Sequence, residues 1–192
     1  MKLLRIDSSP RSEDSLSRRA LDGVLSALEA VDLVHRDLGS SPLPHFDESW
    51  IGANFTPDAA RNDEQRQHLE LSDRLVAEVE SADALLIGAP IYNFGTPARL
   101  KNWIDHLARA GLTFTYSADG PVGLLTDKPV RVLVSSGGTQ VGSGADFSTP
   151  YLRHVLAFVG LRDVRFEAAQ AVLDDEALRD ALAADLRASA GG

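Results

Sequence analysis

The segment ALLIGA, residues 84–89, lies near the middle of the chain, contains no polar side chain and is followed directly by Pro90. A strand with one face in water alternates apolar and polar side chains, whereas a strand that is apolar throughout is covered on both faces. Coverage of both faces is typical of parallel sheets, because the helices that connect parallel strands pack on each side. The segment therefore predicts an inner strand of a parallel sheet.

The rest of the chain alternates between short strand patterns and helical patterns. Four further strands are predicted, at residues 3–6, 31–37, 130–134 and 163–168. Apolar side chains recur at helical spacing in five segments, residues 21–28, 71–79, 96–107, 152–159 and 178–186. This alternation predicts an α/β fold, a doubly wound five-stranded parallel sheet with helices on both faces. Since no repeat and no linker interrupts it, residues 1–192 are expected to form one domain.

Some segments lack a regular pattern or mark a boundary. Residues 38–57 and 111–128 are predicted to be long irregular loops. Asp174 is expected to cap the final helix, because a carboxylate accepts hydrogen bonds from the free amides of the first turn. The terminal segment ASAGG, residues 188–192, is expected to fray.

The composition excludes several kinds of chemistry and partner. Without cysteine, the chain has no disulfide, no thiolate nucleophile and no cysteine-held zinc or iron–sulfur site. A net charge of −9 argues against binding to nucleic acid or to an anionic membrane. The five histidines lack the spacing of a metal site, so no metal is expected and surface or capping positions are expected for them. Neither a membrane-length apolar segment nor a signal peptide is present, which predicts a cytoplasmic protein.

Ligands of a doubly wound sheet bind at the carboxyl ends of its strands, and the first such loop is rich in serine. It begins after Asp7 and reads SSPRSEDSLSRR. Free amides at a helix start attract anions and hydroxyls add small donors, so we interpret this turn as an uncharged, hydroxyl-lined phosphate site. The motifs GxxxxGK[ST] and GxGxxG are absent, which argues against a nucleoside triphosphate or a dinucleotide. The alternative is that Ser15 or Ser17 only caps the helix.

Two other loops at predicted strand ends offer flat or close surfaces to a ligand. Residues 92–95, YNFG, present aromatic walls and an amide, and residues 135–138, SSGG, permit close backbone approach. The alternatives are an aromatic turn that caps the core and a flexible glycine loop. Together with the phosphate turn, these loops predict a site for a mononucleotide with a large flat ring, a shape that flavin mononucleotide (FMN) has.

Three longer motifs occur in an order that resembles one known family. They are PIYNFGTPARLKNWID from residue 90, RAGLTFTYSADGPVGLL from residue 109, and VSSGG from residue 134 followed by TPYLRHVLAFVGL from residue 149. They resemble the FMN-dependent NADH-azoreductases, flavodoxin-like quinone and azo-dye reductases. The resemblance extends from Met1 to about Ala169 and implies the flavodoxin-like form of the predicted sheet.

The resemblance also implies the chemistry. FMN is the expected cofactor, NADH or NADPH the electron donor, and a quinone or azo compound the acceptor. The implied cycle is ping-pong: the flavin takes a hydride and then passes on two electrons, with no catalytic side chain and no metal. Family members are homodimers with both flavins near the interface. The long loops at residues 38–57 and 111–128 are then expected to wall the flavin and to form the contact between subunits.

Specific residues match the family's binding positions. The residues implied for the phosphate are Ser9, Ser15, Leu16 and Ser17. The residues implied along the flavin ring and the ribityl chain are Pro90, Ile91, Tyr92, Asn93 and Phe94, and those at the opposite edge are Ser135, Ser136, Gly137 and Gly138. Tyr116 and Phe158 match aromatic positions that border the ring or the substrate, in part from the second subunit.

Two other interpretations fit the same pattern. A non-catalytic flavodoxin-type electron carrier would hold FMN without sheltering a nicotinamide, and a flavin-free interaction module would use the fold alone. A serine hydrolase on a similar sheet is not supported, because the chain has no GxSxG motif.

Overall fold

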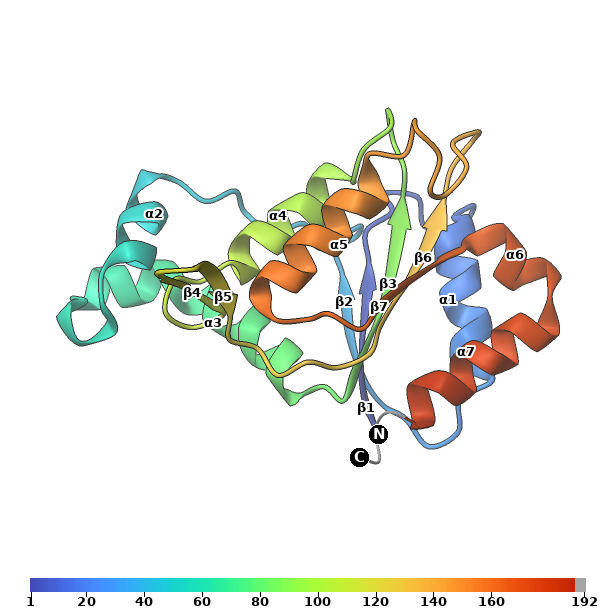
Figure 1. Ribbon diagram of the computed structural model, residues 1–192, viewed down its shortest axis with the longest axis horizontal. Coiled ribbons are helices and arrows are strands. Elements are labelled where there is room, and N and C mark those ends of the chain that lie inside the picture. The colour runs from blue at the N-terminus through green and yellow to red at the C-terminus, as the bar shows by residue number, and fades with distance from the viewer. Residues whose placement is uncertain (189–192) are drawn as a thin grey trace.

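A central five-stranded sheet with the order β2-β1-β3-β6-β7 forms the middle of the computed structural model, which describes residues 1–188 (Figure 1). Each neighbouring pair in this sheet is parallel, which confirms the predicted fold class. The expectation of a frayed end falls on residues 189–192, which lie outside the described residues, and on Ala188. The strands of the sheet are β1 (Lys2–Asp7), β2 (Asp32–Asp37), β3 (Ala84–Pro90), β6 (Val130–Ser135) and β7 (Val164–Ala168).

Helices cover both faces of the sheet. In Figure 1, α3, α4 and α5 lie on one side of the strands, and α1, α6 and α7 lie on the other. Within residues 1–188, no helix combines the length and the apolar character that a membrane span requires. The helices that flank the sheet are α1 (Leu16–Ser26), α3 (Asp63–Ser81), α4 (Ala98–Leu107), α5 (Ser148–Val159), α6 (Ala169–Asp174) and α7 (Glu176–Ala188).

Every residue of β3 is buried, as its sequence predicts. Leu85 and Ile87 face α3, α4 and α5, whereas Ala84 and Leu86 belong to the core under α1, α6 and α7. Burial of a leucine or isoleucine side chain contributes about 1.5–3 kcal/mol, so the two cores hold the sheet between its helical layers.

Gly88 lets α1 lie close to the end of β3. A Cβ atom at this position would lie 2.8 Å from Leu21 Cδ1 and 3.4 Å from Ser17 Cβ. These distances leave no room for a side chain between the strand and the helix. The first turn of α1 is therefore held beside the carboxyl end of the sheet.

The expectation that residues 38–57 are irregular is wrong in part, because they contain the helix α2 (Glu48–Phe55), which is followed by a short 3₁₀ helix, η1 (Asp58–Ala60). Asp47 caps α2 by accepting a hydrogen bond from the Trp50 amide at 2.9 Å. The Trp50 side chain packs in a small core with Leu69 of α3. Packing against a distant helix stabilises α2, and its own sequence shows no amphipathic period that would reveal it.

The second long segment, residues 111–128, contains an antiparallel hairpin of β4 (Phe114–Ser117) and β5 (Gly120–Gly123). Gly120 has a φ of +115°, a conformation that suits glycine and closes the turn. The expectation of an irregular loop is therefore wrong for residues 114–123.

Two smaller expectations are also wrong. Asp174 ends α6, and Asp175 caps α7 by accepting a hydrogen bond from the Leu178 amide at 3.2 Å. Asp174 cannot be the N-cap of α7, because it is the last residue of the short helix α6, which precedes α7. His106 is buried, and not at the surface as expected for the histidines. Both ring nitrogens have partners, since Nδ1 lies 2.9 Å from Ser72 Oγ and Nε2 lies 2.9 Å from the Pro44 carbonyl oxygen.

Candidate functional site

The loops after β1, β3 and β6 meet at the carboxyl edge of the sheet, at the top of Figure 1. Two adjoining cavities lie at this edge. The second, of about 450 Å³, shares Leu16 and residues 135–137 with the first and extends to Gly138. Within residues 1–188, all the predicted cofactor-binding residues line one of the two cavities except Ser17, Asn93 and Phe94. The first cavity, of about 340 Å³, is lined by Ser9, Arg11, Asp14, Ser15, Leu16, Pro90, Ile91, Tyr92, Ser135, Ser136 and Gly137.

Ser15 is the N-cap of α1, as the alternative interpretation of this loop predicts. Its Oγ accepts a hydrogen bond from the Arg18 amide at 3.4 Å and lies 3.1 Å from the Oγ of the buried Ser17. A cap of this kind contributes about 0.5–2 kcal/mol. Capping does not exclude binding, because a hydroxyl that accepts a hydrogen bond keeps its proton for another acceptor. The start of α1 therefore presents hydroxyls and a helix dipole to the cavity.

Ser9 and Tyr92 connect the first loop to the second. Ser9 Oγ accepts a hydrogen bond from the Arg11 amide at 3.2 Å and lies 3.5 Å from the Tyr92 Oη. Ser8, by contrast, points into the protein and donates to the Gly88 carbonyl oxygen at 2.6 Å. The two neighbouring serines therefore differ in role: Ser8 bonds the loop to β3, and Ser9 lines the cavity.

Residues 92–95 form a tight turn. The Tyr92 amide donates to the Gly95 carbonyl at 3.2 Å, and the Gly95 amide donates back at 3.1 Å. Asn93 and Phe94 between them have φ values of +49° and +69°, as the central residues of a type I′ turn do. Both side chains are exposed, and the Phe94 carbonyl accepts a hydrogen bond from the Phe147 amide at 3.2 Å. The turn is therefore closed by hydrogen bonds, with two of its residues in a strained left-handed conformation.

The loop after β6 is closed by its own side chain. Ser136 Oγ donates to the Thr139 carbonyl at 2.5 Å and accepts from the Gly138 amide at 3.3 Å. The space around Gly137 and Gly138 is open, since a Cβ atom at either position would meet nothing within 4 Å. The glycines thus allow a flat group to approach the backbone directly.

Tyr116 and Phe158 lie outside both cavities. Their rings contact Phe114 from two sides, with centroid distances of 5.7 and 4.6 Å. Tyr116 belongs to β4 and Phe158 to the last turn of α5, whereas the cavities adjoin the first turn of α1 and the loop that leads into α5. Within one chain these two residues therefore do not border the cavity, and their predicted role depends on a second subunit.

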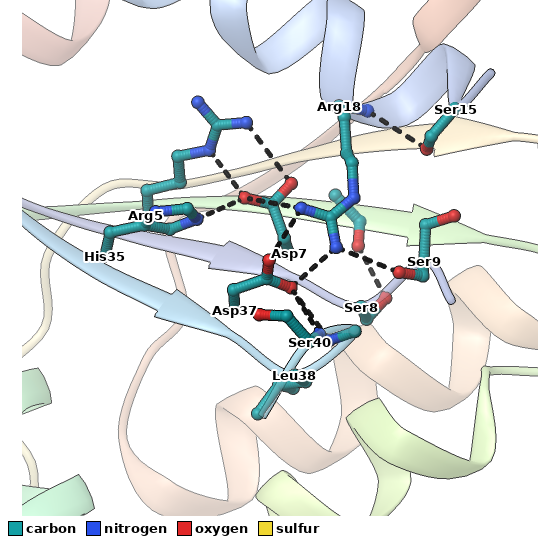
Figure 2. A network of polar contacts seen from close by, with 12 residues as sticks. Arg5, Asp7, Ser8, Ser9, Ser15, Arg18, His35, Asp37, Leu38 and Ser40 are labelled. Carbon is teal, nitrogen blue, oxygen red and sulfur yellow. Dashed lines mark hydrogen bonds and ion pairs between the residues drawn. The ribbon is translucent and has the colours of Figure 1, made fainter. Parts of the chain in front are cut away.

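A cluster of buried charges lies beneath the serine loop (Figure 2). Asp7, at the end of β1, has a fully buried side chain and contacts Arg5 Nε at 2.7 Å and His35 Nε2 at 2.6 Å. Arg18 of α1 pairs with Asp37 of β2 through both carboxylate oxygens, at 2.6 and 3.0 Å. The cluster therefore joins the ends of β1 and β2 to the first turn of α1.

The environment of Asp37 lowers the pKa of its carboxyl. Burial alone would raise this pKa, but hydrogen bonds from the Arg18 guanidinium, from Ser40 and from the Gly39 amide outweigh burial. The pKa consequently lies well below its ordinary value. Asp37 is therefore a fixed negative charge over the physiological range of pH.

The cavity also contains residues that the sequence interpretation overlooked. Arg11 and Asp14 line its wall, so the description of the turn as uncharged is wrong. Both lie between the serines of the first loop, and their charged side chains within that loop were the available signal. Arg18 was overlooked because its partner Asp37 is on another strand, and only the register of β1 against β2 places Asp7 opposite Asp37.

Comparison with known proteins gives a family and several named relatives. The family model described as "Flavodoxin-like fold" matches residues 1–190. The chain is 51% identical over 173 residues to FMN-dependent NADH:quinone oxidoreductase 1 of Jannaschia sp. (strain CCS1), covering 90% of each protein. It is 49% identical over 173 residues to FMN-dependent NADH:quinone oxidoreductase of Thiobacillus denitrificans (strain ATCC 25259 / T1), covering 88% of this chain and 84% of the relative.

A solved structure gives the same picture of the fold. The azoreductase from Bacillus anthracis str. Sterne superposes with a TM-score of 0.78 at 25% identity. The match covers 98% of this chain and 96% of the azoreductase.

The lowered pKa of Asp37 predicts how stability depends on pH. Asp37 stabilises the fold above the pKa of an unfolded aspartate, about 3.9, and this contribution is lost as the pH falls toward the folded-state pKa. Asp37→Asn should lower the free energy of unfolding at pH 7 by about 1–3 kcal/mol and should reduce its further decrease below about pH 4. Thermal unfolding midpoints at neutral and acidic pH measure both effects.

Asp58 provides the control for this experiment, because its carboxylate is exposed although it pairs with Arg61 Nη1 at 3.0 Å. Asp58→Asn should lower the unfolding midpoint at pH 7 much less than Asp37→Asn does. An Asp37→Asn variant whose stability falls with acid as steeply as that of the wild type would contradict the assignment.

Proposed function

The chain belongs to the family with the flavodoxin-like fold, and from this premise we propose that it is an FMN-dependent NADH:quinone oxidoreductase that also reduces azo compounds. The observation that carries the proposal is the cavity at the ends of β1, β3 and β6, where the hydroxyls at the start of α1 face two loops that can hold a flat ring. Its relatives named as FMN-dependent oxidoreductases support it over an electron carrier or a flavin-free module.

The residues at the start of α1 fit the phosphate of FMN. Its dianion would accept hydrogen bonds from hydroxyls and from the free amides of the first helical turn. The cavity wall carries one positive charge, of Arg11, and one negative charge, of Asp14. Ser17 does not line the cavity, and its contact with Ser15 Oγ gives it an indirect role in orienting that hydroxyl. We assign the phosphate to Ser9, Ser15 and Leu16, with Ser17 acting through its contact with Ser15.

The loops after β3 and β6 fit the remainder of the cofactor. Pro90, Ile91 and Tyr92 line one side of the cavities, and residues 135–138 line another. Asn93 and Phe94 follow Tyr92 with exposed side chains, and we propose that they contact the ring or the ribityl chain. When bound, FMN supplies the redox chemistry, taking a hydride from NADH or NADPH and passing two electrons to a quinone or azo acceptor. We propose that donor and acceptor use the same face in turn. The chain itself binds and orients, and it contributes no catalytic side chain.

We also propose that the protein is a homodimer. Large apolar side chains are exposed on α2 and around the β4–β5 hairpin, which lie at the same end of the molecule in Figure 1. Exposed apolar side chains gathered at one end are typical of a protein–protein interface. Contact there would bring Tyr116, which is 69% exposed, toward a partner, together with Phe158. The exposed apolar residues at this end are Ile51, Phe55, Leu112, Tyr116, Val122 and Leu124.

The family model matches almost the whole chain, which supports a single domain over residues 1–192. A cytoplasmic location follows from the proposed donor, because NADH is a metabolite of the cell interior. Fractionation of cells that express the chain tests this location by the distribution of quinone reductase activity.

The function is tested first on the purified protein. We expect it to bind FMN with visible flavin absorbance, to lose that absorbance when NADH is added without oxygen, and to recover it when a quinone follows. Absorbance spectra record each step. A protein that binds no flavin would be an interaction module, and one whose flavin NADH does not reduce would be an electron carrier.

The phosphate assignment is tested with Ser15→Ala/Ser17→Ala. Loss of hydrogen bonds to a charged group should weaken FMN binding by about tenfold to a hundredfold, or roughly 1.5–3 kcal/mol. Titration of flavin fluorescence measures the dissociation constant. Ser26→Ala at the opposite end of α1 is the control, since Ser26 Oγ bonds only the Gly23 carbonyl among the described residues. Unchanged FMN affinity in the double variant would refute the assignment.

The dimer is tested by sedimentation velocity and steady-state kinetics. We expect the wild type to sediment as a dimer, and Tyr116→Ser to raise the KM for quinone about tenfold, or roughly 1.4 kcal/mol, while it leaves FMN affinity unchanged. Leu33→Ser, an exposed apolar residue on the edge strand β2, should change neither property. A monomer with full turnover would contradict the proposal.

A further inference from the structure

The Arg18 side chain, which does not line the cavity, bonds the backbone of the serine loop. Its Nε donates a hydrogen bond to the Arg11 carbonyl oxygen at 2.9 Å, and its Nη2 donates to the Ser9 carbonyl oxygen at 3.0 Å. Both oxygens are thereby turned toward the guanidinium. A carbonyl oxygen that faced the cavity would repel an anion, so these two contacts keep the negative ends of two peptide groups engaged elsewhere.

The guanidinium is itself held in place by β2. Asp37 accepts two hydrogen bonds from it, and the Arg18 side chain is only 13% exposed. Gly39, just after β2, packs directly against the bonded Arg18 and Ser9 groups. A Cβ atom at this position would come within 2.1 Å of the Ser9 carbonyl oxygen and 2.3 Å of Arg18 Nη2. Figure 2 shows Arg18 between Asp37 and the carbonyl end of Ser9. The position of the loop is thus set by a strand that does not touch the cavity.

The charge of Arg18 is already balanced within the cluster. The carboxylates of Asp7, Asp22 and Asp37 face the guanidinium groups of Arg5 and Arg18, and His35 contacts Asp7. With a neutral histidine the cluster carries one net negative charge. Arg18 does not line the cavity. Its geometry is therefore that of a residue that orients the loop, and not of a direct ligand for an anion.

We propose that Arg18 is a positioning residue that shapes the phosphate end of the cavity and thereby makes the site prefer FMN to riboflavin, which lacks the phosphate. The inference rests on the proposed function and adds a specificity determinant to it. Because the Arg18 side chain acts through the Ser9 and Arg11 carbonyl groups, its loss should affect the phosphate end of the ligand and leave the ring-binding loops as they are.

The test compares dissociation constants for FMN and riboflavin, measured by fluorescence titration of the full chain after its flavin has been removed. Arg18→Lys keeps a charge but cannot reach two carbonyls and a carboxylate together. We expect it to weaken FMN binding about tenfold, the equivalent of one lost charge-assisted contact, and to leave riboflavin binding nearly unchanged. Arg18→Gln should have a larger effect in the same direction.

Arg5→Lys is the matched control. Arg5 belongs to the same buried cluster and bonds Asp7 and Asp22, but it makes no contact with residues 8–12 in the described part of the chain. This variant should keep the wild-type ratio of the two dissociation constants even where it lowers thermal stability. Equal weakening of FMN and riboflavin in Arg18→Lys, or no weakening of either, would overturn the inference.

Gly39→Ala provides a second route if the arginine variants do not fold. The added methyl group would displace the Ser9 carbonyl from Arg18 while every charge is kept, and we expect the same selective loss of FMN affinity. A wild type that binds neither flavin would overturn the proposed function together with this inference. A wild type that prefers FMN, beside a Gly39→Ala variant that prefers it equally, would overturn this inference alone.

Discussion

The ion pair between Arg18 and Asp37 fixes the start of the first helix against the end of the edge strand β2. It joins the first helix, the edge strand and the loop whose carbonyls Arg18 also binds. A buried charge is costly unless it is paired and its hydrogen-bonding groups are satisfied, and here the guanidinium meets a bidentate carboxylate and two carbonyl oxygens. The pair contributes more to the geometry of the site than to net stability, because most of its Coulomb energy offsets the cost of dehydrating both groups.

The apolar packing places this polar cluster where it can act. In β3, leucine and isoleucine side chains fill both faces in the middle of the strand, whereas the small residues Gly88 and Ala89 follow them near its carboxyl end. At Gly88 the strand has no side chain, and α1 lies directly against it. The free amides of the helix start, the serine hydroxyls and the ends of β3 and β6 are therefore concentrated in one region of the surface.

The sequence was sufficient for the sheet and for most of the cavity wall. The apolar run at residues 84–89 and the alternation around it depend on local periodicity, and local periodicity survives in the folded chain. The helix α2 and the burial of His106 were not predictable, since both depend on contacts such as that of Trp50 with Ser72 that join distant segments. Arg18 and Asp37 were missed for the same reason: a charged residue on a helix and another at a strand end look solvent-exposed until the register pairs them.

In the turn at residues 92–95, the exposed side chain of Phe94 comes with a backbone conformation that lowers stability. Phe94 has a left-handed backbone conformation that glycine adopts without strain and that costs other residues roughly 1–2 kcal/mol. Its ring is more than half exposed, so burial regains little of that energy. Glycine at position 94 would consequently relieve this strain and leave less apolar surface beside Tyr92, which lines the cavity. A selection for thermostability alone would be expected to remove this aromatic ring early.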